Sequence, residues 1–424
     1  MELRPGYKET EIGVIPEDWD VQGLLSTVRI ATGQVDPKAA PFDEMPLIAP
    51  DHIESGTGRL LEIRTARQQN AISGKYLFSA GDIVYSKIRP YLRKAILADF
   101  GGLCSADMYP LRPELGISGR YILDNLLAHR FTKYAESVSV RSGMPKINRV
   151  ELADFRIPLP KPPEQKAIAE ALSDVDASIA ALSRLIAKKR DLRQGAMQRL
   201  LTGQTRLPGF TAQWQESRLG AIGRFIKGNG VRRDEAQSGD LPCVRYGEIY
   251  TTHHNVVHHF TSYISRAVAH NATRIQRGDL LFAASGETKE EIGKCVALAH
   301  DGEAYAGGDI IILRPTSGNP VFLGYLLNMP DVVRQKANKG QGDAVVHIGA
   351  TALAAIEIGL PEEPEQAAIA KVLSNMDAEI TVLEARLDKT RALKQAMMQA
   401  LLTGRVRLPI PRDVAPQTKE AAYA

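Results

Sequence analysis

The sequence predicts an α+β protein in which two globular segments are each followed by one long helix, and the two helices form an antiparallel coiled coil. Two observations carry this prediction. Residues 157–208 and 358–409 share 28 identities in 52 aligned positions, which marks an internal duplication. In both copies the apolar residues alternate steps of four and three, the heptad spacing of a helix that packs on another helix.

Each copy of the repeat has six apolar positions that form the heptad seam. They are Ile168, Leu172, Val175, Ile179, Leu182 and Ile186 in the first copy, and Ile369, Leu373, Met376, Ile380, Leu383 and Leu387 in the second. A helix of about 39 residues is roughly 58 Å long, too long to bury such a stripe in one small domain. Each apolar side chain left in water forgoes roughly 1.5–3 kcal/mol, so we expect the two copies to pack on each other.

The ends of both helices carry recognisable signals. Each copy starts with a proline followed by glutamate, at Pro163-Glu164 and Pro364-Glu365, where the helix dipole favours an acid. Each copy finishes with a Thr-Gly pair, and glycine readily adopts the left-handed conformation that ends a helix. The helices are therefore predicted over residues 163–203 and 364–404.

Chain order predicts how the helices run. Only a short linker separates the first helix from Trp214, and the second globular segment runs almost directly into Pro364. That segment must join the end of one helix to the start of the other, which is easiest when these two ends are neighbours. We therefore expect an antiparallel pair with one globular segment at each end and an approximate two-fold axis between the halves.

The predicted organisation has five parts. Residues 1–156 form the first globular domain, 157–209 the first helix with its linkers, 210–357 the second globular domain, 358–410 the second helix and 411–424 a disordered tail. Short β-branched runs broken by Gly and Pro predict a twisted antiparallel sheet in each globular domain. Helices are expected near residues 120–137 and 321–338. The two domains share landmarks such as Gly81-Asp82 and Gly278-Asp279 but otherwise diverge.

Composition excludes several classes of protein. The 424 residues are 44% hydrophobic and 24% charged, with a net charge of +4, which is ordinary for a soluble globular protein. No segment reaches eighteen apolar residues and the start lacks a signal-peptide core, so we expect a cytoplasmic protein that does not associate with membranes. Cys104, Cys243 and Cys295 lie far apart and are predicted to be free buried thiols.

No arrangement of residues supports catalysis, so the sequence predicts a protein that is not an enzyme. A DNA methyltransferase would need a glycine-rich cofactor loop and an Asn/Asp-Pro-Pro-aromatic motif, and neither occurs. Glu164-Gln165-Lys166 has the Glu-x-Lys form of metal-dependent nucleases, but the second copy reads Glu365-Gln366-Ala367. Both glutamates lie at helix starts, which favours a capping role.

A histidine cluster raises the question of a metal site. Its members are His253, His254, His258 and His259, and imidazoles at these spacings could converge on zinc. The cluster has no counterpart in the first half and no nearby cysteine. We therefore expect exposed loop residues or residues that face DNA, and no bound metal.

The arrangement of domain, helix, domain, helix resembles the specificity subunit of type I restriction–modification enzymes. The resemblance rests on Ile157-Pro158-Leu159-Pro160 leading into Pro163-Glu164-Gln165, and on Ile358-Gly359-Leu360-Pro361 leading into Pro364-Glu365-Gln366. It covers nearly the whole chain, because the entry segments around Trp19 and Trp214 are also similar to those of that family.

This resemblance implies a function and a set of partners. The globular segments would be two target-recognition domains, each reading one half of an interrupted site in double-stranded DNA. Two modification (methyltransferase) subunits would bind S-adenosylmethionine, and restriction (endonuclease/translocase) subunits would use ATP and Mg²⁺. The chain itself would bind none of these cofactors and would supply only the sequence recognition.

Basic and amide side chains on loops are the predicted DNA contacts, because arginine pairs with guanine edges and lysine more often contacts phosphates. Lys87, Arg89, Arg93 and Lys94 cluster within one loop of the first domain. The full prediction for the first domain is Lys87, Arg89, Arg93, Lys94, Arg141, Lys146 and Asn148, and for the second domain Arg232, Arg233, Lys289, Lys294, Lys339 and His347.

Two other hypotheses remain open from the sequence. A helical scaffold or oligomerisation protein without DNA specificity would explain the duplicated helices, but not two divergent globular domains with basic loops. An unrecognised nuclease or methylase is disfavoured by the missing motifs. Salt-dependent duplex binding distinguishes the first alternative, and activity of the isolated chain distinguishes the second.

Overall fold

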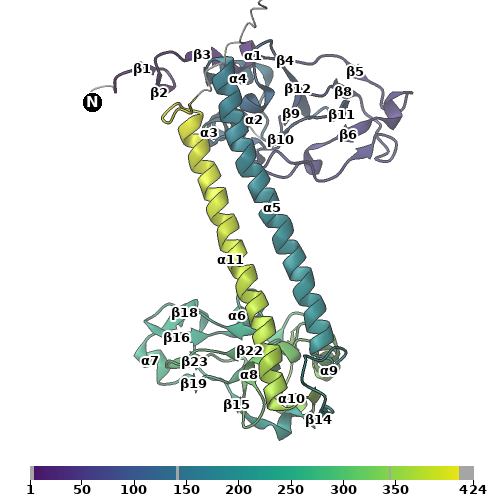
Figure 1. Ribbon diagram of the computed structural model, residues 1–424, viewed down its shortest axis with the longest axis vertical. Coiled ribbons are helices and arrows are strands. Elements are labelled where there is room, and N and C mark those ends of the chain that lie inside the picture. The colour runs from purple at the N-terminus through teal and green to yellow at the C-terminus, as the bar shows by residue number, and fades with distance from the viewer. Residues whose placement is uncertain (1–3, 140–142, 343–344, 410–424) are drawn as a thin grey trace, which may run out of the picture. The chain divides into compact units, whose positions relative to one another are not determined.

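The computed structural model describes residues 4–139, 143–342 and 345–409 (Figure 1). The predicted tail at 411–424 and the predicted contact Arg141 lie outside these residues. The chain divides into two compact units, which we call the first unit (up to Ser183 and from Ala385 onward) and the second unit (Arg184–Glu384). Each unit contains one globular domain and one segment of each long helix.

The two long helices are α5 (Pro162–Leu200) and α11 (Glu363–Leu401), close to the predicted bounds. They run antiparallel in each unit, as predicted. In the first unit Asp176 of α5 meets Lys394 of α11, and in the second unit Arg193 of α5 meets Asp377 of α11. All twelve predicted seam residues are buried or half-buried, with Leu172 and Leu373 fully buried.

The globular domain of the first unit contains two main sheets and several short helices (Figure 1). The first sheet has the order β10-β9-β12-β4, built from β4 (Val28–Ile30), β9 (Ile83–Ser86), β10 (Ala95–Leu97) and β12 (Met108–Pro113). The second has the order β5-β8-β11-β6-β7, built from β5 (Gln34–Val35), β6 (Pro46–Ile48), β7 (Arg64–Thr65), β8 (Lys75–Phe78) and β11 (Gly102–Cys104).

The remaining elements of the first unit connect these sheets to each other and to α5. Two small sheets pair β1 (Tyr7–Thr10) with β2 (Gly13–Pro16), and β3 (Asp20–Gly23) with β13 (Arg156–Leu159). The short helices are α1 (Leu24–Thr27), η1 (Phe42–Glu44), η2 (Pro50–His52), η3 (Pro90–Leu92), α2 (Gly119–Leu127), α3 (His129–Ser139) and α4 (Arg149–Asp154).

The globular domain of the second unit repeats this plan. One sheet has the order β15-β24-β20-β22-β17, from β15 (Gly223–Lys227), β17 (Val256–Val257), β20 (Leu280–Ala283), β22 (Cys295–Leu298) and β24 (Ile310–Pro315). The other has the order β18-β16-β23-β19, from β16 (Leu241–Val244), β18 (Ser262–Ile264), β19 (Thr273–Ile275) and β23 (Ala304–Ala306).

The smaller elements of the second unit correspond only in part to those of the first. Two-stranded sheets pair β14 (Gln215–Arg218) with β26 (Glu357–Leu360), and β21 (Ser285–Gly286) with β25 (Val346–His347). The short helices are η4 (Leu219–Ala221), η5 (Arg233–Glu235), α6 (Tyr246–Thr251), α7 (Arg266–Ala269), α8 (Pro320–Leu326), α9 (Pro330–Lys339) and α10 (Ala350–Ala354).

The sheets and helices differ from the prediction in two details. Each domain contains parallel pairing within its largely antiparallel sheets, namely β6 with β11 in the first and both β16 with β23 and β17 with β22 in the second. The helices expected near 120–137 and 321–338 are each broken into two. In the second unit the break precedes Pro330, which lacks the amide hydrogen needed to continue a helix and instead begins α9.

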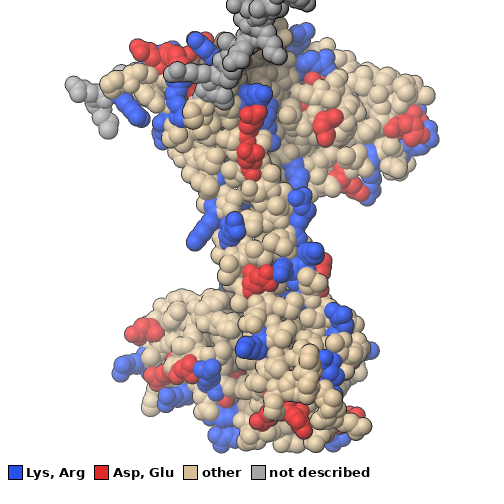
Figure 2. All heavy atoms as spheres, in the orientation of Figure 1, with Lys and Arg blue, Asp and Glu red and all other residues tan. Residues whose placement is uncertain are grey.

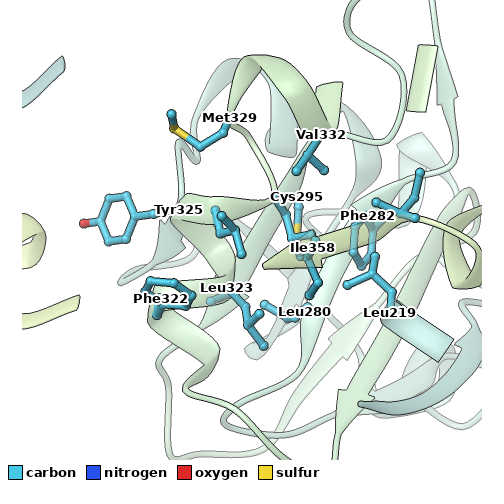
Figure 3. Close-up of a cluster of buried hydrophobic side chains, with 14 of the residues drawn as sticks. Leu219, Leu280, Phe282, Cys295, Phe322, Leu323, Tyr325, Met329, Val332 and Ile358 are labelled. Atoms are coloured by element: carbon cyan, nitrogen blue, oxygen red, sulfur yellow. The ribbon is translucent and has the colours of Figure 1, made fainter. Parts of the chain in front are cut away.

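Each globular core includes residues from the long helices. In the second unit Leu200, Ile369 and Leu373 pack with Phe322 and Leu323 of α8. Figure 3 shows Tyr325 of α8 directed away from the other labelled core side chains, and its hydroxyl donates a hydrogen bond to Asp377 of α11 at 2.5 Å. The helices are therefore part of each domain's core.

The repeated Pro-Glu-Gln motif anchors each domain to the helix pair. Glu164, which is buried, accepts two hydrogen bonds from Arg407 at 2.8 and 2.6 Å, and Glu365 accepts two from Arg206 at 2.6 Å. Each arginine follows the end of the other long helix. The glutamates lie in the acidic first turns of α5 and α11, as the capping interpretation requires, but their side chains form buried ion pairs.

The neighbouring glutamines of the motif join each long helix to a short helix of its own domain. Gln165 accepts a hydrogen bond from the Ser118 amide at 2.9 Å, at the start of α2. Gln366 accepts one from the Asn319 amide at 2.8 Å, at the start of α8. The motif thus holds the domain in a defined orientation on its helix segments.

Candidate nucleic-acid interface

In the first unit, the loop after β9 and the segment before α4 lie side by side. An isolated bridge pairs Ile88 with Lys146, and the Arg89 amide donates to the Pro145 carbonyl at 2.8 Å. These contacts bring together Lys87, Arg89 and Lys146, three of the predicted DNA contacts. Arg89 and Lys146 are exposed and Lys87 is half-buried, so this loop pair presents cations to solvent.

Arg89 has an unusual backbone. Its φ is +48°, a region that residues other than glycine rarely adopt. Such conformations cost of order 1–3 kcal/mol and concentrate at functional sites. The following residues form η3, where Tyr91 is exposed and offers an aromatic face.

The second unit has the same loop pair with different side chains. Here β21 follows β20 and pairs with β25, so that Ser285 lies opposite His347 and its hydroxyl is 2.9 Å from the histidine Nδ1. His347 is exposed, and its backbone also pairs with Gln341. Ser285 is buried and takes the place of Ile88, whereas Ala284, Gly286 and His347 take the places of Lys87, Arg89 and Lys146. The equivalent positions therefore carry three cations in one unit and a single exposed imidazole in the other.

Three other predicted contacts of the first unit have different surroundings. The ammonium of Lys94 donates to the Pro50 carbonyl at 2.7 Å, and Asn148 caps α4 by accepting from the Glu151 amide at 2.9 Å. Arg93 lies at the far end of η3, where its guanidinium packs against Gly56 and lines a cavity. These side chains are not gathered with Lys87, Arg89 and Lys146.

The predicted contacts of the second unit are also dispersed. Lys289 is exposed on the loop after β21, and half-buried Lys294 closes that loop by donating to the Tyr250 carbonyl at 3.2 Å. Lys339 lines a separate cavity with Arg218 and Glu357. Arg232 and Arg233 are exposed at η5, a segment whose neighbours are β18 and α7.

Sequence reasoning missed Arg149, the first residue of α4. Its guanidinium lies 5.9 Å from the centre of the Tyr109 ring, and the Lys87 ammonium lies 5.1 Å from the same ring. Both cations are therefore held beside one buried aromatic side chain. The position of Arg149 directly after a capping asparagine was visible in the sequence, but the shared ring is a tertiary contact and left no pattern.

Charge on the long helices is largely internal. Lys189, Arg190 and Arg193 of α5 form ion pairs with Glu379, Glu384 and Asp377 of α11 in the second unit. On the face drawn in Figure 2, acidic and basic side chains are interspersed over each unit. We therefore expect the positive potential that attracts DNA to come from the basic loops of the globular domains.

The histidine cluster is only partly exposed. His253 is buried and its ring lies 6.0 Å from that of His259, whereas His254, His258 and His259 are exposed. Burial lowers the pKa of His253 below its ordinary value. Within the described part of the chain, no three His, Cys, Asp or Glu side chains are grouped as a metal site.

The three cysteines are free and buried, as predicted. Burial raises the pKa of each thiol to about 12, so they are inert at neutral pH. The loop pairs therefore offer hydrogen bonding and charge: guanidinium and ammonium groups of the first unit for phosphates and guanine, and the His347 imidazole of the second unit for base edges.

Comparisons with known proteins agree with this architecture. A family model described as a type I restriction modification DNA specificity domain matches residues 16–188 and again residues 212–390. The EcoDI type I restriction enzyme specificity subunit of Escherichia coli is 32% identical over 213 residues, covering 49% of this chain and 46% of that protein. The match thus spans about half of that relative.

Other relatives match over nearly their full length. The putative MjaX type I restriction enzyme specificity subunit of Methanocaldococcus jannaschii is 25% identical, over 95% of this chain and 97% of that protein. A solved S subunit of the type I restriction–modification system from M. genitalium has a TM-score of 0.60 at 16% identity, covering 95% of this chain and 98% of that one. That likeness establishes the fold alone. No helix among the described residues is long and apolar enough to cross a membrane.

Proposed function

Since the chain belongs to the family defined by the type I restriction modification DNA specificity domain, we propose that it is the sequence-recognition subunit of a type I restriction–modification complex. In this role it reads an interrupted, bipartite site in double-stranded DNA and catalyses no reaction itself. Each globular domain reads one half-site.

The observation that carries the proposal is the repeated loop pair with different side chains. The two domains keep the same framework, yet the first has the cations Lys87, Arg89 and Lys146 where the second has Ala284, Gly286 and the exposed imidazole of His347. A helical scaffold would have no need for two distinct polar surfaces on one framework. Two domains that recognise different DNA sequences require two different surfaces.

Energetics favour two readers on one chain. A domain that reads three or four base pairs, at about 1–3 kcal/mol per mismatch, selects too weakly among millions of competing sites. The discrimination of two domains adds when both bind one duplex. The anchoring of each domain by Glu164 or Glu365, and by Gln165 or Gln366, supports such additivity because it fixes each reader on its helix segments.

Partners follow from the proposed role. Two methyltransferase subunits would bind S-adenosylmethionine and modify the site, and restriction subunits would use ATP and Mg²⁺. The paired helices offer exposed apolar side chains for docking, among them Leu192 and Leu393, which occupy the same position in the two copies of the repeat and are 49% and 54% exposed. We propose that the methyltransferase subunits dock there.

The proposal is tested by a methylome of cells that carry this chain with its methyltransferase partner. We expect methylation at one bipartite sequence with a constant gap. The purified assembly should then bind a duplex of that sequence with strong salt dependence, and changing either half-site should weaken binding. A methylome without a new motif, together with binding that does not discriminate among sequences, would refute the proposal.

A further inference from the structure

The first unit contains a cavity of about 600 Å³ between its globular domain and the paired helices, and its lining is rich in cations. The cationic residues that line it are Arg59, Arg93, Arg120, Arg391 and Lys394. They come from the globular domain and from α11, so the site is assembled from parts of the chain far apart in sequence.

The acids of this cavity are already paired. Glu54 accepts a hydrogen bond from Arg59 at 2.9 Å. Asp176 of α5 receives the Lys394 ammonium at 2.7 Å and also pairs with Arg120. Two cations remain: Arg391, whose only ion-pair partner among the described residues is exposed Asp388 at 3.4 Å, and Arg93.

The guanidinium of Arg93 forms no polar contact within the described part of the chain: it has no hydrogen-bond or ion-pair partner there. The φ of Arg93 is +48°, a costly conformation for a residue with a side chain. An unpaired cation on a strained backbone contributes little to stability, so a ligand is the physical reason to keep it.

Gly56 provides the place where the guanidinium rests. A Cβ at this position would lie 2.8 Å from Arg93 Nη2 and 3.0 Å from Cζ, so a side chain here would displace the guanidinium. Gly56 also has a φ of +71°, and its amide donates to the Arg93 carbonyl at 3.1 Å. The two backbones are thus joined, and the guanidinium of Arg93 packs against Gly56.

We propose that this cavity binds a phosphate group, with Arg93 and Arg391 as its principal ligands. A guanidinium offers parallel N–H donors that match phosphate oxygens, and the paired acids keep further cations in place without neutralising these two. The phosphate could belong to the DNA backbone or to a free nucleotide or polyphosphate. Binding of a DNA backbone phosphate rests on the proposed function, whereas binding of a free nucleotide or polyphosphate does not.

The first experiment measures the melting temperature of the full chain with sodium pyrophosphate, against sodium chloride at equal ionic strength. A phosphate ligand should raise it by a few degrees, because a ligand that binds only the folded state stabilises it. Arg93→Gly should abolish this rise while keeping the melting temperature without pyrophosphate, since glycine adopts φ of +48° freely. Arg391→Gln, at an exposed position, should reduce it.

Asn70→Gly is the matched control. Asn70 lies in the same unit, has a φ of +51° and is not among the residues lining this cavity. It should retain the full pyrophosphate response. If pyrophosphate raises the melting temperature equally in the parent and in all three variants, it binds as an adventitious ion only and the proposal is overturned.

The second experiment distinguishes the DNA source. If a backbone phosphate fills the cavity, the slope of log K against log salt for duplex binding should fall by about 0.9 in Arg93→Gly and in Arg391→Gln, but not in Asn70→Gly. If the protein shows no pyrophosphate response and the substitutions leave the slope unchanged, the site is refuted. If the parent assembly binds no duplex at all, the proposed function fails and the pyrophosphate result alone decides this inference.

Discussion

Individual residues show that a cation's contacts decide its role more than its place in the sequence. Of the four cations in the basic loop 87–94, Arg89 is exposed beside Lys146, Lys87 lies against Tyr109, Lys94 is bound to a carbonyl and Arg93 lines a cavity. Cations that are neighbours in the sequence therefore have different surroundings and different roles. DNA contact is assigned most directly to Arg89.

Arg89→Ala should weaken binding of the cognate duplex by about 1–3 kcal/mol if the guanidinium contacts a base edge. The expected loss is largest at one position of the first half-site. Fluorescence anisotropy with single-base variants of the duplex measures it. Arg334→Ala, an exposed arginine on α9 paired with Asp331, is the control, and unchanged affinity of Arg89→Ala at moderate salt would remove Arg89 from the interface.

Lys336 makes the stability of the second unit depend on pH. It is buried, and its ammonium donates to the carbonyls of Gly293 at 2.6 Å and Leu327 at 2.8 Å, with no carboxylate partner among the described residues. Burial lowers its pKa from 10.5 to about 8. The folded state therefore holds the proton less tightly than the unfolded state, a difference worth roughly 3 kcal/mol.

Lys336 should add stability as pH rises from about 8 to about 10.5, because only the unfolded chain still binds its proton in that window. The buried thiols of Cys243 and Cys295 act in the opposite direction above about 9, so this gain is the difference between the parent and Lys336→Met. Lys336→Met should lack this gain. Urea unfolding at several pH values, followed by a probe in the second unit, measures it. A parallel pH profile in both proteins would show that Lys336 is not responsible.

At the scale of elements, the Pro-Glu-Gln motif explains why the long helices diverged less than the domains. Each helix start must receive an arginine from the other copy and an amide from its own domain, so several side chains are constrained together. The two starts differ in two contacts. Arg407 also pairs with Asp18 at 2.7 Å, whereas the ion-pair partner of Arg206 among the described residues is Glu365. Trp19 Nε1 donates to Glu164 at 3.0 Å, whereas Trp214 Nε1 is buried without a partner in the described structure.

These differences predict unequal effects of equivalent substitutions. Glu365→Ala should cost about 3–5 kcal/mol, because it removes the ion-pair partner of Arg206. Glu164→Ala leaves Arg407 paired with Asp18, so its cost should come mainly from the unsatisfied Trp19 indole and amount to about 1–3 kcal/mol. Unfolding followed by fluorescence of the single remaining tryptophan, in Trp19→Phe and Trp214→Phe backgrounds, reports each unit. No measurable cost of Glu164→Ala would contradict the role of the Trp19 hydrogen bond.

At the scale of the whole molecule, the duplication makes each globular domain a replaceable part. Both domains attach through the same set of contacts to the same kind of helix segment. Recognition and attachment are therefore carried by different residues of one domain. The consequence is that one reader can change while the other and the helices stay the same.

Replacing residues 1–156 by the corresponding segment of a relative should change one half of the methylated site and leave the other half and the gap unchanged. The replacement must keep a tryptophan at position 19, which donates to Glu164, and a Ser or Asn at position 118, whose side chain caps α2 while its backbone amide binds Gln165. A methylome of cells carrying the hybrid chain provides the measurement. A change in both half-sites would contradict independent readers.

The sequence by itself determined the long helices, their antiparallel packing and the α+β domains, because heptad spacing, helix-end signals and a duplicated segment are local patterns in the chain. Only the tertiary structure decided which cations gather at one surface. Arg89 meets Lys146 and Arg93 meets Gly56 through contacts between segments distant in sequence, and a loop has no period from which such partners can be read. The buried pair of Glu164 and Arg407 likewise appeared in sequence only as a helix-start acid and a basic residue near the end of the chain.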